Sequence, residues 1–266
     1  MPYNFILVAL CVGLFLIMAI MPYFGYRIAL WQAKKGFTVL DNGSIGVVMS
    51  ALFALLGLLI AFTFSGAFSR FDERRQIIVE EINRIGTAYS RLDLLEPESK
   101  QEMHNLFRGY VESRSRIFPL LIDREAVISE LANSTRLQNE IWSKLITLTE
   151  KKDYRDTRTL LLPAFNQMFD ITTVRTIAVQ THPPPMIFIV LCMIAMVCSG
   201  MVGYGVNTNK RYQLSSAHVV GFASVVAFVL YVILDVEFPR IGLVTLENVN
   251  GLFAKFLVEM DAQIIQ

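Results

Sequence analysis

The sequence predicts an all-α integral membrane protein, with four transmembrane helices and a helical soluble bundle inserted between the second and the third. Two observations lead to this fold class. Of the 266 residues, 54% are hydrophobic, with a mean hydropathy of +0.48, and the charged residues are unevenly spread. Four windows hold no Asp, Glu, Lys or Arg: residues 1–26, 42–69, 176–209 and 212–234. Each can hold the roughly 20 apolar residues that a helix needs to cross a bilayer.

These windows predict membrane-spanning helices at about residues 5–30, 44–68, 185–206 and 215–235. In lipid, only helices and closed barrels satisfy the hydrogen-bonding groups of the backbone. These runs are too long and too uniform for barrel strands, so we expect helices. The first run has no basic residues before it and no A-x-A site after it, which favours a retained helix over a cleaved signal peptide. Pro22 lies inside this run, where it either kinks the helix or ends the span.

Charge divides the chain into four parts. The segment between the two helical hairpins carries 17 Lys and Arg and 17 Asp and Glu, and its apolar residues recur at helical spacing. We therefore expect a transmembrane hairpin at 1–69, a helical soluble domain at 70–183, a second hairpin at 184–235 and an amphipathic tail at 236–266.

The second span is predicted to continue into the soluble domain. Residues 44–68 carry no charge, and they run without a proline into SRFDERRQIIVEEINRIGTAYSRLDLL. Within the soluble domain, further helices are expected at about 97–117, 123–149 and 156–180, the last broken or kinked near Pro163.

The tail has an apolar stripe typical of an amphipathic helix. Such a helix packs on the soluble bundle or lies on the membrane surface, and the scarcity of cations in the tail favours packing.

Motifs for enzymatic chemistry are missing from the sequence. It has no Gly-rich phosphate loop, no nucleophile elbow and no HExxH, and its three histidines are scattered. The adjacent Glu80 and Glu81 point about 100° apart on a helix, so we expect them to pair with nearby arginines on a solvated face. The three cysteines fall inside predicted spans without a CxxC. The net charge of +1 gives no signal for nucleic acid. We therefore expect no catalytic site, no metal and no cofactor.

The second span has the features of a helix that could line a pore. The spans lack internal charges, which argues against a proton relay, so any conduit would be lined by apolar and small residues. Small residues recur every four positions at Gly57, Ala61 and Ser65. A bulky row on an adjacent face holds Leu56, Ile60, Phe64 and Phe68. Two interpretations remain open: a packing face with a lipid face, or a pore-lining helix.

Residues 53–89 resemble the second helix of bestrophins, with matching positions at Gly57, Arg70, Phe71, Glu73 and Arg74. The stretch DVEFPRIG at 235–242 is similar to the turn after the last bestrophin membrane helix, and the order of spans and insert also agrees. RFDERRQ, the TAYSRLDLL stretch and LLPAFNQMFDITTVRT look like the bacterial bestrophin-like family.

This resemblance implies a bestrophin-like fold and a pentameric, chloride-type anion channel whose pore is lined by the second helix. Anchoring the register on Gly57 places Ser50, Ala54 and Leu58 at the neck. The candidate pore-lining residues are Ser50, Ala54, Gly57, Leu58 and Ala61, and the candidate pore-mouth charges are Arg70, Arg74 and Arg75. The expected partners are the lipid bilayer, further copies of the chain and inorganic anions.

A second hypothesis is a non-conducting membrane scaffold or signalling protein whose soluble helices bind a partner. In either case the resemblance implies a multi-pass protein of the bacterial inner membrane with a cytoplasmic soluble domain. The basic residues near the spans, six on one side and five on the other, do not decide the orientation.

Overall fold

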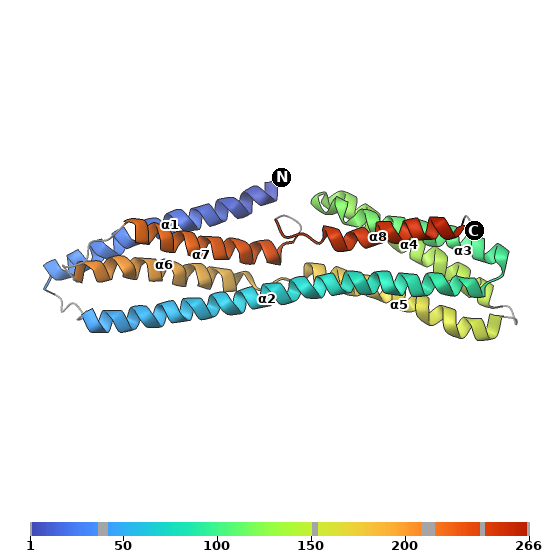
Figure 1. Ribbon diagram of the computed structural model, residues 1–266, viewed down its shortest axis with the longest axis horizontal. Coiled ribbons are helices and arrows are strands. Elements are labelled where there is room, and N and C mark those ends of the chain that lie inside the picture. The colour runs from blue at the N-terminus through green and yellow to red at the C-terminus, as the bar shows by residue number, and fades with distance from the viewer. Residues whose placement is uncertain (1, 37–41, 151–153, 209–215, 240–242, 265–266) are drawn as a thin grey trace. The chain divides into compact units, whose positions relative to one another are not determined.

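The fold is helical throughout the part of the chain that the structure describes. The computed structural model describes residues 2–36, 42–150, 154–208, 216–239 and 243–264, and none of these residues is in a strand. The elements are α1 (Pro2–Lys34), α2 (Asn42–Ser90), the 3-10 turn η1 (Arg91–Leu94), α3 (Pro97–Ile117), η2 (Pro119–Ile122), α4 (Arg124–Thr149), α5 (Arg155–Gln180), α6 (Pro185–Thr208), α7 (Ser216–Glu237) and α8 (Glu247–Ile264) (Figure 1). The predicted fold class is confirmed.

The chain forms two compact units. The first comprises Met1–Phe71 and His182–Val244, and the second comprises Asp72–Thr181 and Thr245–Gln266. Within the described residues, four helices are long and apolar enough to cross a membrane, by length and composition. α2 is one continuous helix whose first part belongs to the first unit and whose last part belongs to the second.

In the first unit, α1 packs against α6 and α7 (Figure 1). The core holds Met18 of α1, Leu56 of α2, Leu191 of α6 and Leu230 of α7, each at most 4% exposed. Many large apolar side chains of these helices remain exposed in the single chain, as expected for helices that face lipid or other copies.

Pro22 does not end α1, which continues to Lys34. A proline lacks the N–H that would bond the carbonyl four residues earlier, so the Met18 carbonyl is left without its usual donor. Ser199 of α6 supplies one, with Oγ 2.5 Å from that oxygen. A neighbouring helix therefore satisfies the freed backbone group, as a membrane interior requires.

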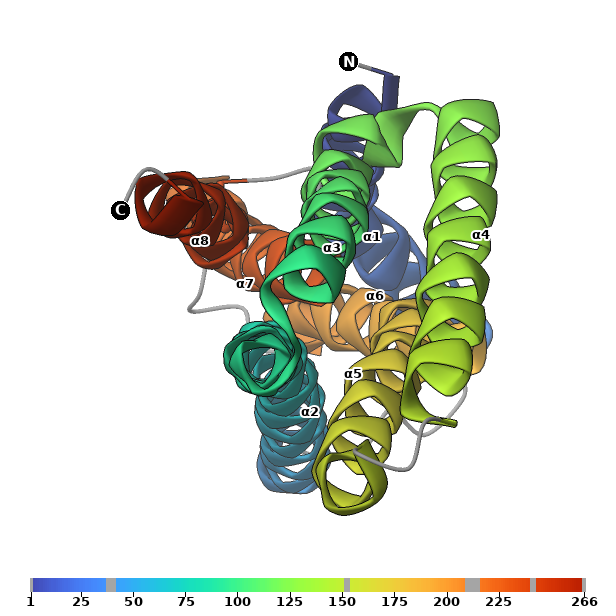
Figure 2. The same cartoon turned by 90° about the vertical axis from the view of Figure 1, so that its right-hand side faces the viewer.

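The second unit is a bundle in which α3 packs against α4 and α8, and α4 against α5 (Figure 2). Pro97 occupies the start of α3. Asp123 caps α4, its Oδ1 accepting from the backbone N–H groups of Glu125 and Ala126 at 3.0 and 3.1 Å. The amphipathic tail helix α8 buries Phe253 and Met260, each 1% exposed.

Of the two alternatives at Pro163, a break does not occur, because α5 runs as one helix from Arg155 to Gln180, and a kink there stays a prediction. The residues on either side of the proline, Leu161, Ala164 and Phe165, are at most 3% exposed. Their burial in the core of the second unit holds the helix together across the one missing backbone hydrogen bond.

Candidate functional site

The predicted pore-lining residues all lie on the exposed side of α2. The opposite side of this helix is buried, with Ile45, Leu56 and Ala67 at 3%, 3% and 0% exposure. A Cβ atom built on Gly57 would meet nothing within 4 Å. The five exposed candidates are Ser50, Ala54, Gly57, Leu58 and Ala61. Their role in a pore remains a prediction.

The bulky row predicted on an adjacent face does not form one face. Leu56 is buried, whereas Phe64 and Phe68 are 41% and 55% exposed and stack with ring centroids 6.4 Å apart. At roughly 100° per residue, each step of four advances about 40° beyond a full turn. Three such steps carry the row from the packed side of α2 to its exposed side.

Arg70, the first candidate mouth charge, forms a close ion pair with Glu237 at the end of α7. Its Nε and Nη2 atoms lie 2.9 and 2.6 Å from Glu237 Oε2. The Glu237 side chain is fully buried, and its other oxygen lies 3.0 Å from His182 Nδ1. Arg70 therefore neutralises the buried carboxylate of Glu237, a residue to which the sequence interpretation gave no role. The same contact compensates the positive charge of Arg70 locally.

Arg74, the second candidate, holds the end of α5. The residue is 5% exposed, and its guanidinium donates to the carbonyls of Ala178 and Thr181 at 3.1 and 2.8 Å. The last carbonyls of a helix lack intrahelical donors and lie at its negative end, so an arginine suits this position.

Arg75, the third candidate, keeps a largely exposed guanidinium. Its side chain is 59% exposed, and Nη1 lies 3.9 Å from Asp72 Oδ1. An exposed pair at this distance contributes little energy. Of the three arginines, Arg75 is therefore the best placed to act on ions in solution, and the mouth role of all three remains a prediction.

Asp235, at the end of the last span, organises the turn that follows α7. It is 3% exposed, and its carboxylate accepts hydrogen bonds from the backbone N–H groups of Leu243 and Val244 at 2.9 and 3.1 Å. Residues 240–242 of the bestrophin-like turn lie outside the described residues.

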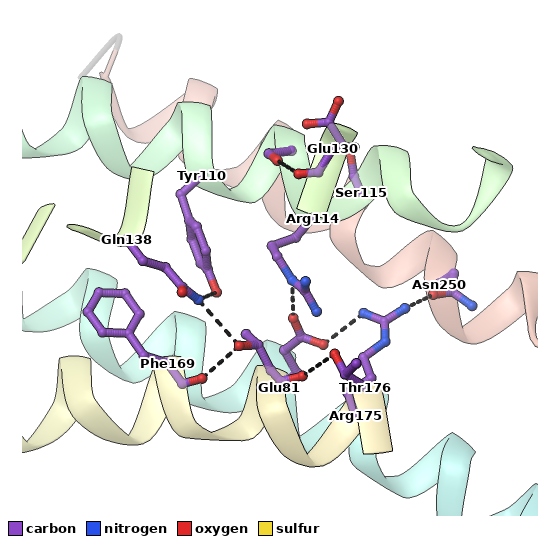
Figure 3. A network of polar contacts seen from close by, with 12 residues as sticks. Glu81, Tyr110, Arg114, Ser115, Glu130, Gln138, Phe169, Arg175, Thr176 and Asn250 are labelled. Atoms are coloured by element: carbon purple, nitrogen blue, oxygen red, sulfur yellow. Dashed lines mark hydrogen bonds and ion pairs between the residues drawn. The ribbon is translucent and has the colours of Figure 1, made fainter. Parts of the chain in front are cut away.

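The expectation that Glu81 lies on a solvated face is wrong. Its neighbour Glu80 does pair with Arg84 on the surface, but the Glu81 side chain is fully buried between two arginines (Figure 3). Arg114 Nε of α3 lies 2.6 Å from Oε1, and Arg175 Nη1 of α5 lies 2.7 Å from Oε2. One carboxylate thus joins three helices of the second unit.

The same network reaches α8 and the middle of the bundle. Arg175 Nη2 donates to Asn250 Oδ1 at 2.7 Å (Figure 3). Its guanidinium also lies 5.4 Å from the Phe253 ring. Nearby, Gln138 donates to the hydroxyl of Tyr110 at 3.4 Å. Burial raises the pKa of Tyr110 to about 12, so this hydroxyl stays protonated at neutral pH.

Tyr89 and His104, also buried in the second unit, have side-chain atoms without hydrogen-bond partners. The two rings stack with centroids 4.7 Å apart, and Phe256 of α8 packs edge-on against Tyr89. The Tyr89 hydroxyl and His104 Nε2 are buried and unpaired. Burial, together with the charge of Lys100, lowers the pKa of His104, while Asp93 opposes this shift. A charged His104 is therefore disfavoured in the folded protein.

We expect His104 to make folding sensitive to acid. When the pH falls below about 6.5, His104 takes up a proton more readily in the unfolded chain than in the folded one, so the free energy of unfolding decreases. Phe in its place can still stack on Tyr89 but does not titrate. Urea unfolding at pH 7.5 and pH 5.5 should show a smaller loss of stability for His104→Phe than for the wild type. An equal loss in both would contradict the prediction.

No group of three His, Cys, Asp or Glu side chains within the described residues could hold a metal ion. Of the three histidines, His104 is buried, His182 contacts Glu237 and His218 is exposed. The sequence interpretation missed the contact between His182 and Glu237, because 55 residues separate the two positions.

A family model described as the Bestrophin-like domain matches residues 28–248. The chain belongs to the bestrophin-like family. The match begins in α1 and extends to the start of α8, so it includes the whole of α2 and the buried carboxylates Glu81 and Glu237. The suspected family resemblance is thus confirmed.

Solved structures support the bestrophin-like fold. One variant of a bacterial Bestrophin homolog from Klebsiella pneumoniae aligns with a TM-score of 0.70 at 13% identity, covering 96% of this chain and 97% of that one. A second variant of the homolog aligns with a TM-score of 0.67 at 14% identity, covering 94% and 98%. At this identity the likeness establishes the fold. A comparison with curated proteins gives no match.

Proposed function

We propose that this bestrophin-like protein is a homo-oligomeric membrane channel for small inorganic anions, with α2 lining the pore. The observation that carries the proposal is the division of α2 into two sides. One side packs into the core of its own unit, while the side bearing Ser50, Ala54 and Leu58 is exposed and presents small and bulky side chains without charge. A ring of such helices would surround a conduit with apolar walls, and selectivity would then depend on dewetting and on charge at the ends.

The family supports this function over catalysis. By resemblance, five copies of the chain would surround one axis, and chloride-type anions would be the permeant ions. The residues we propose to line the pore are Ser50, Ala54, Gly57, Leu58 and Ala61. We further propose that the protein lies in a bacterial inner membrane with residues 70–183 in the cytoplasm. Labelling of single cysteines from each side of intact cells tests the orientation.

The decisive experiment is anion flux into liposomes that hold the purified protein. Flux well above that of empty vesicles is expected, and flux equal to theirs would overturn the proposal. In that case, a symmetric oligomer with the α2 face packed shut would instead support the scaffold hypothesis. Imaging of the purified oligomer gives the number of copies.

A cysteine test addresses the pore-lining face. In a background without the native Cys11, Cys192 and Cys198, we expect a charged thiol reagent to reduce flux several-fold through Ala54→Cys. Leu55→Cys is the matched control, because Leu55 is also exposed but points about 100° away around the helix. Equal sensitivity at the two positions would exclude Ala54 from the pore.

A further inference from the structure

Asp72 is the first charged residue on the exposed side of α2, a helix that the structure describes throughout. It follows Ala54 by 18 residues, about five full turns at roughly 3.6 residues per turn, so the two share one line along the helix. Ala61, Ser65 and Phe68 lie near this line and carry no charge. Arg70 comes earlier in the sequence but lies on the packed side, where it contacts Glu237.

The charge of Asp72 is poorly compensated. Its side chain is 41% exposed. Gln76 donates to Oδ2 at 2.7 Å but is neutral, and the nearest cation that contacts it, Arg75, is 3.9 Å away with its own side chain 59% exposed. Such a pair is screened by solvent, so Asp72 retains a substantial negative potential.

The other charges at this end of α2 do not replace Asp72 on that line. Arg74 is buried against the end of α5, and Glu73 is exposed but lies about 100° around the helix. The exposed side therefore presents one carboxylate and one guanidinium, Asp72 and Arg75, where the uncharged segment ends. The sequence interpretation counted the arginines and overlooked this acid.

We propose that Asp72 is a selectivity-determining residue, whose carboxylate opposes anion entry and offsets the attraction exerted by Arg75. This inference rests on the proposed function, since it requires α2 to line a pore. In a symmetric oligomer each copy contributes one Asp72, and a ring of carboxylates concentrates cations and repels anions. The balance between Asp72 and Arg75 then sets the ratio of anion to cation permeability.

The test measures reversal potentials of the reconstituted full-length protein under a KCl gradient. We expect Asp72→Asn to raise the ratio of chloride to potassium permeability several-fold and Arg75→Gln to lower it, with both effects weaker at high salt. Glu73→Gln is the matched control, because it removes the same charge one residue along but from a different side of the helix.

The outcomes separate the two proposals. Absence of current from the wild-type protein would overturn both the channel function and this inference. Current that Asp72→Asn changes no more than Glu73→Gln does would overturn the inference alone and leave the channel function standing.

Discussion

Replacing Glu81 by alanine should lower the free energy of unfolding of the second unit by about 3–5 kcal/mol, because it leaves two buried guanidinium groups without their counter-charge. The side chains of Arg114 and Arg175 are only 4% and 11% exposed, so water cannot take over the role of the carboxylate. The three side chains together carry two positive charges and one negative charge, and removing Glu81 raises the net charge from +1 to +2.

Glu80→Ala provides a matched control for this prediction. Glu80 is adjacent in sequence but pairs with Arg84 on the surface, where the loss should be about 0.5 kcal/mol or less. Urea unfolding in detergent can be followed by the fluorescence of Trp142, which lies 6.4 Å from the Phe169 ring in the second unit. This measurement needs a Trp31→Phe background, since the chain has two tryptophans. Similar midpoints for the two variants would contradict the prediction.

The loss of Glu81 should also loosen α8 more than the rest of the unit. Arg175 is held on one side by Glu81 and on the other by Asn250 of α8. Without the carboxylate, the guanidinium is free to turn away from Asn250. Amide hydrogen exchange should therefore show a larger loss of protection in α8 than in α4, because the guanidinium of Arg175 bonds to Glu81 of α2 and Asn250 of α8.

The membrane helices could be predicted from sequence because the signal is local. A window without charges specifies a span by itself, and the expected spans at 185–206 and 215–235 agree with α6 and α7 within two residues. The effect of Pro22 and Pro163 on their helices was harder to predict from sequence, because whether a proline breaks a helix depends on the residues packed around it. At Pro22 the deciding group, the hydroxyl of Ser199, is 181 residues from the carbonyl that it satisfies.

The buried charge network could not be predicted from local spacing, because the partners of Glu81 are 33 and 94 residues away. A weaker signal was present. Glu81 lies four residues from both Ile77 and Ile85, which are buried, so it occupies a core position in an apolar stripe. An acid in such a position needs a buried cation, and the sequence shows one in the corresponding stripe of two other helices.

The second large effect is expected from Gly203→Ala, which should separate α1 from α6 and destabilise the first unit by about 3 kcal/mol or more. A Cβ atom at Gly203 would lie 1.8 Å from the Pro22 carbonyl oxygen, and one at Gly25 would lie 1.9 Å from that of Gly200. Both obstacles are backbone atoms, so no side chain can rotate to make room and the helices must move apart.

Gly13→Ala separates this effect from the general cost of changing a glycine. Gly13 lies on α1, but a Cβ atom there would meet nothing within 4 Å, so alanine should be neutral or stabilise the helix by up to about 1 kcal/mol. Melting in mild detergent can be followed by the fluorescence of Trp31 on α1 in a Trp142→Phe background. Gly203→Ala should melt at least about 5 °C below Gly13→Ala. If the two variants melt at the same temperature, close contact at the glycines does not hold α1 and α6 together. The hydrogen bond from Ser199 to the Met18 carbonyl would then be the contact that joins them.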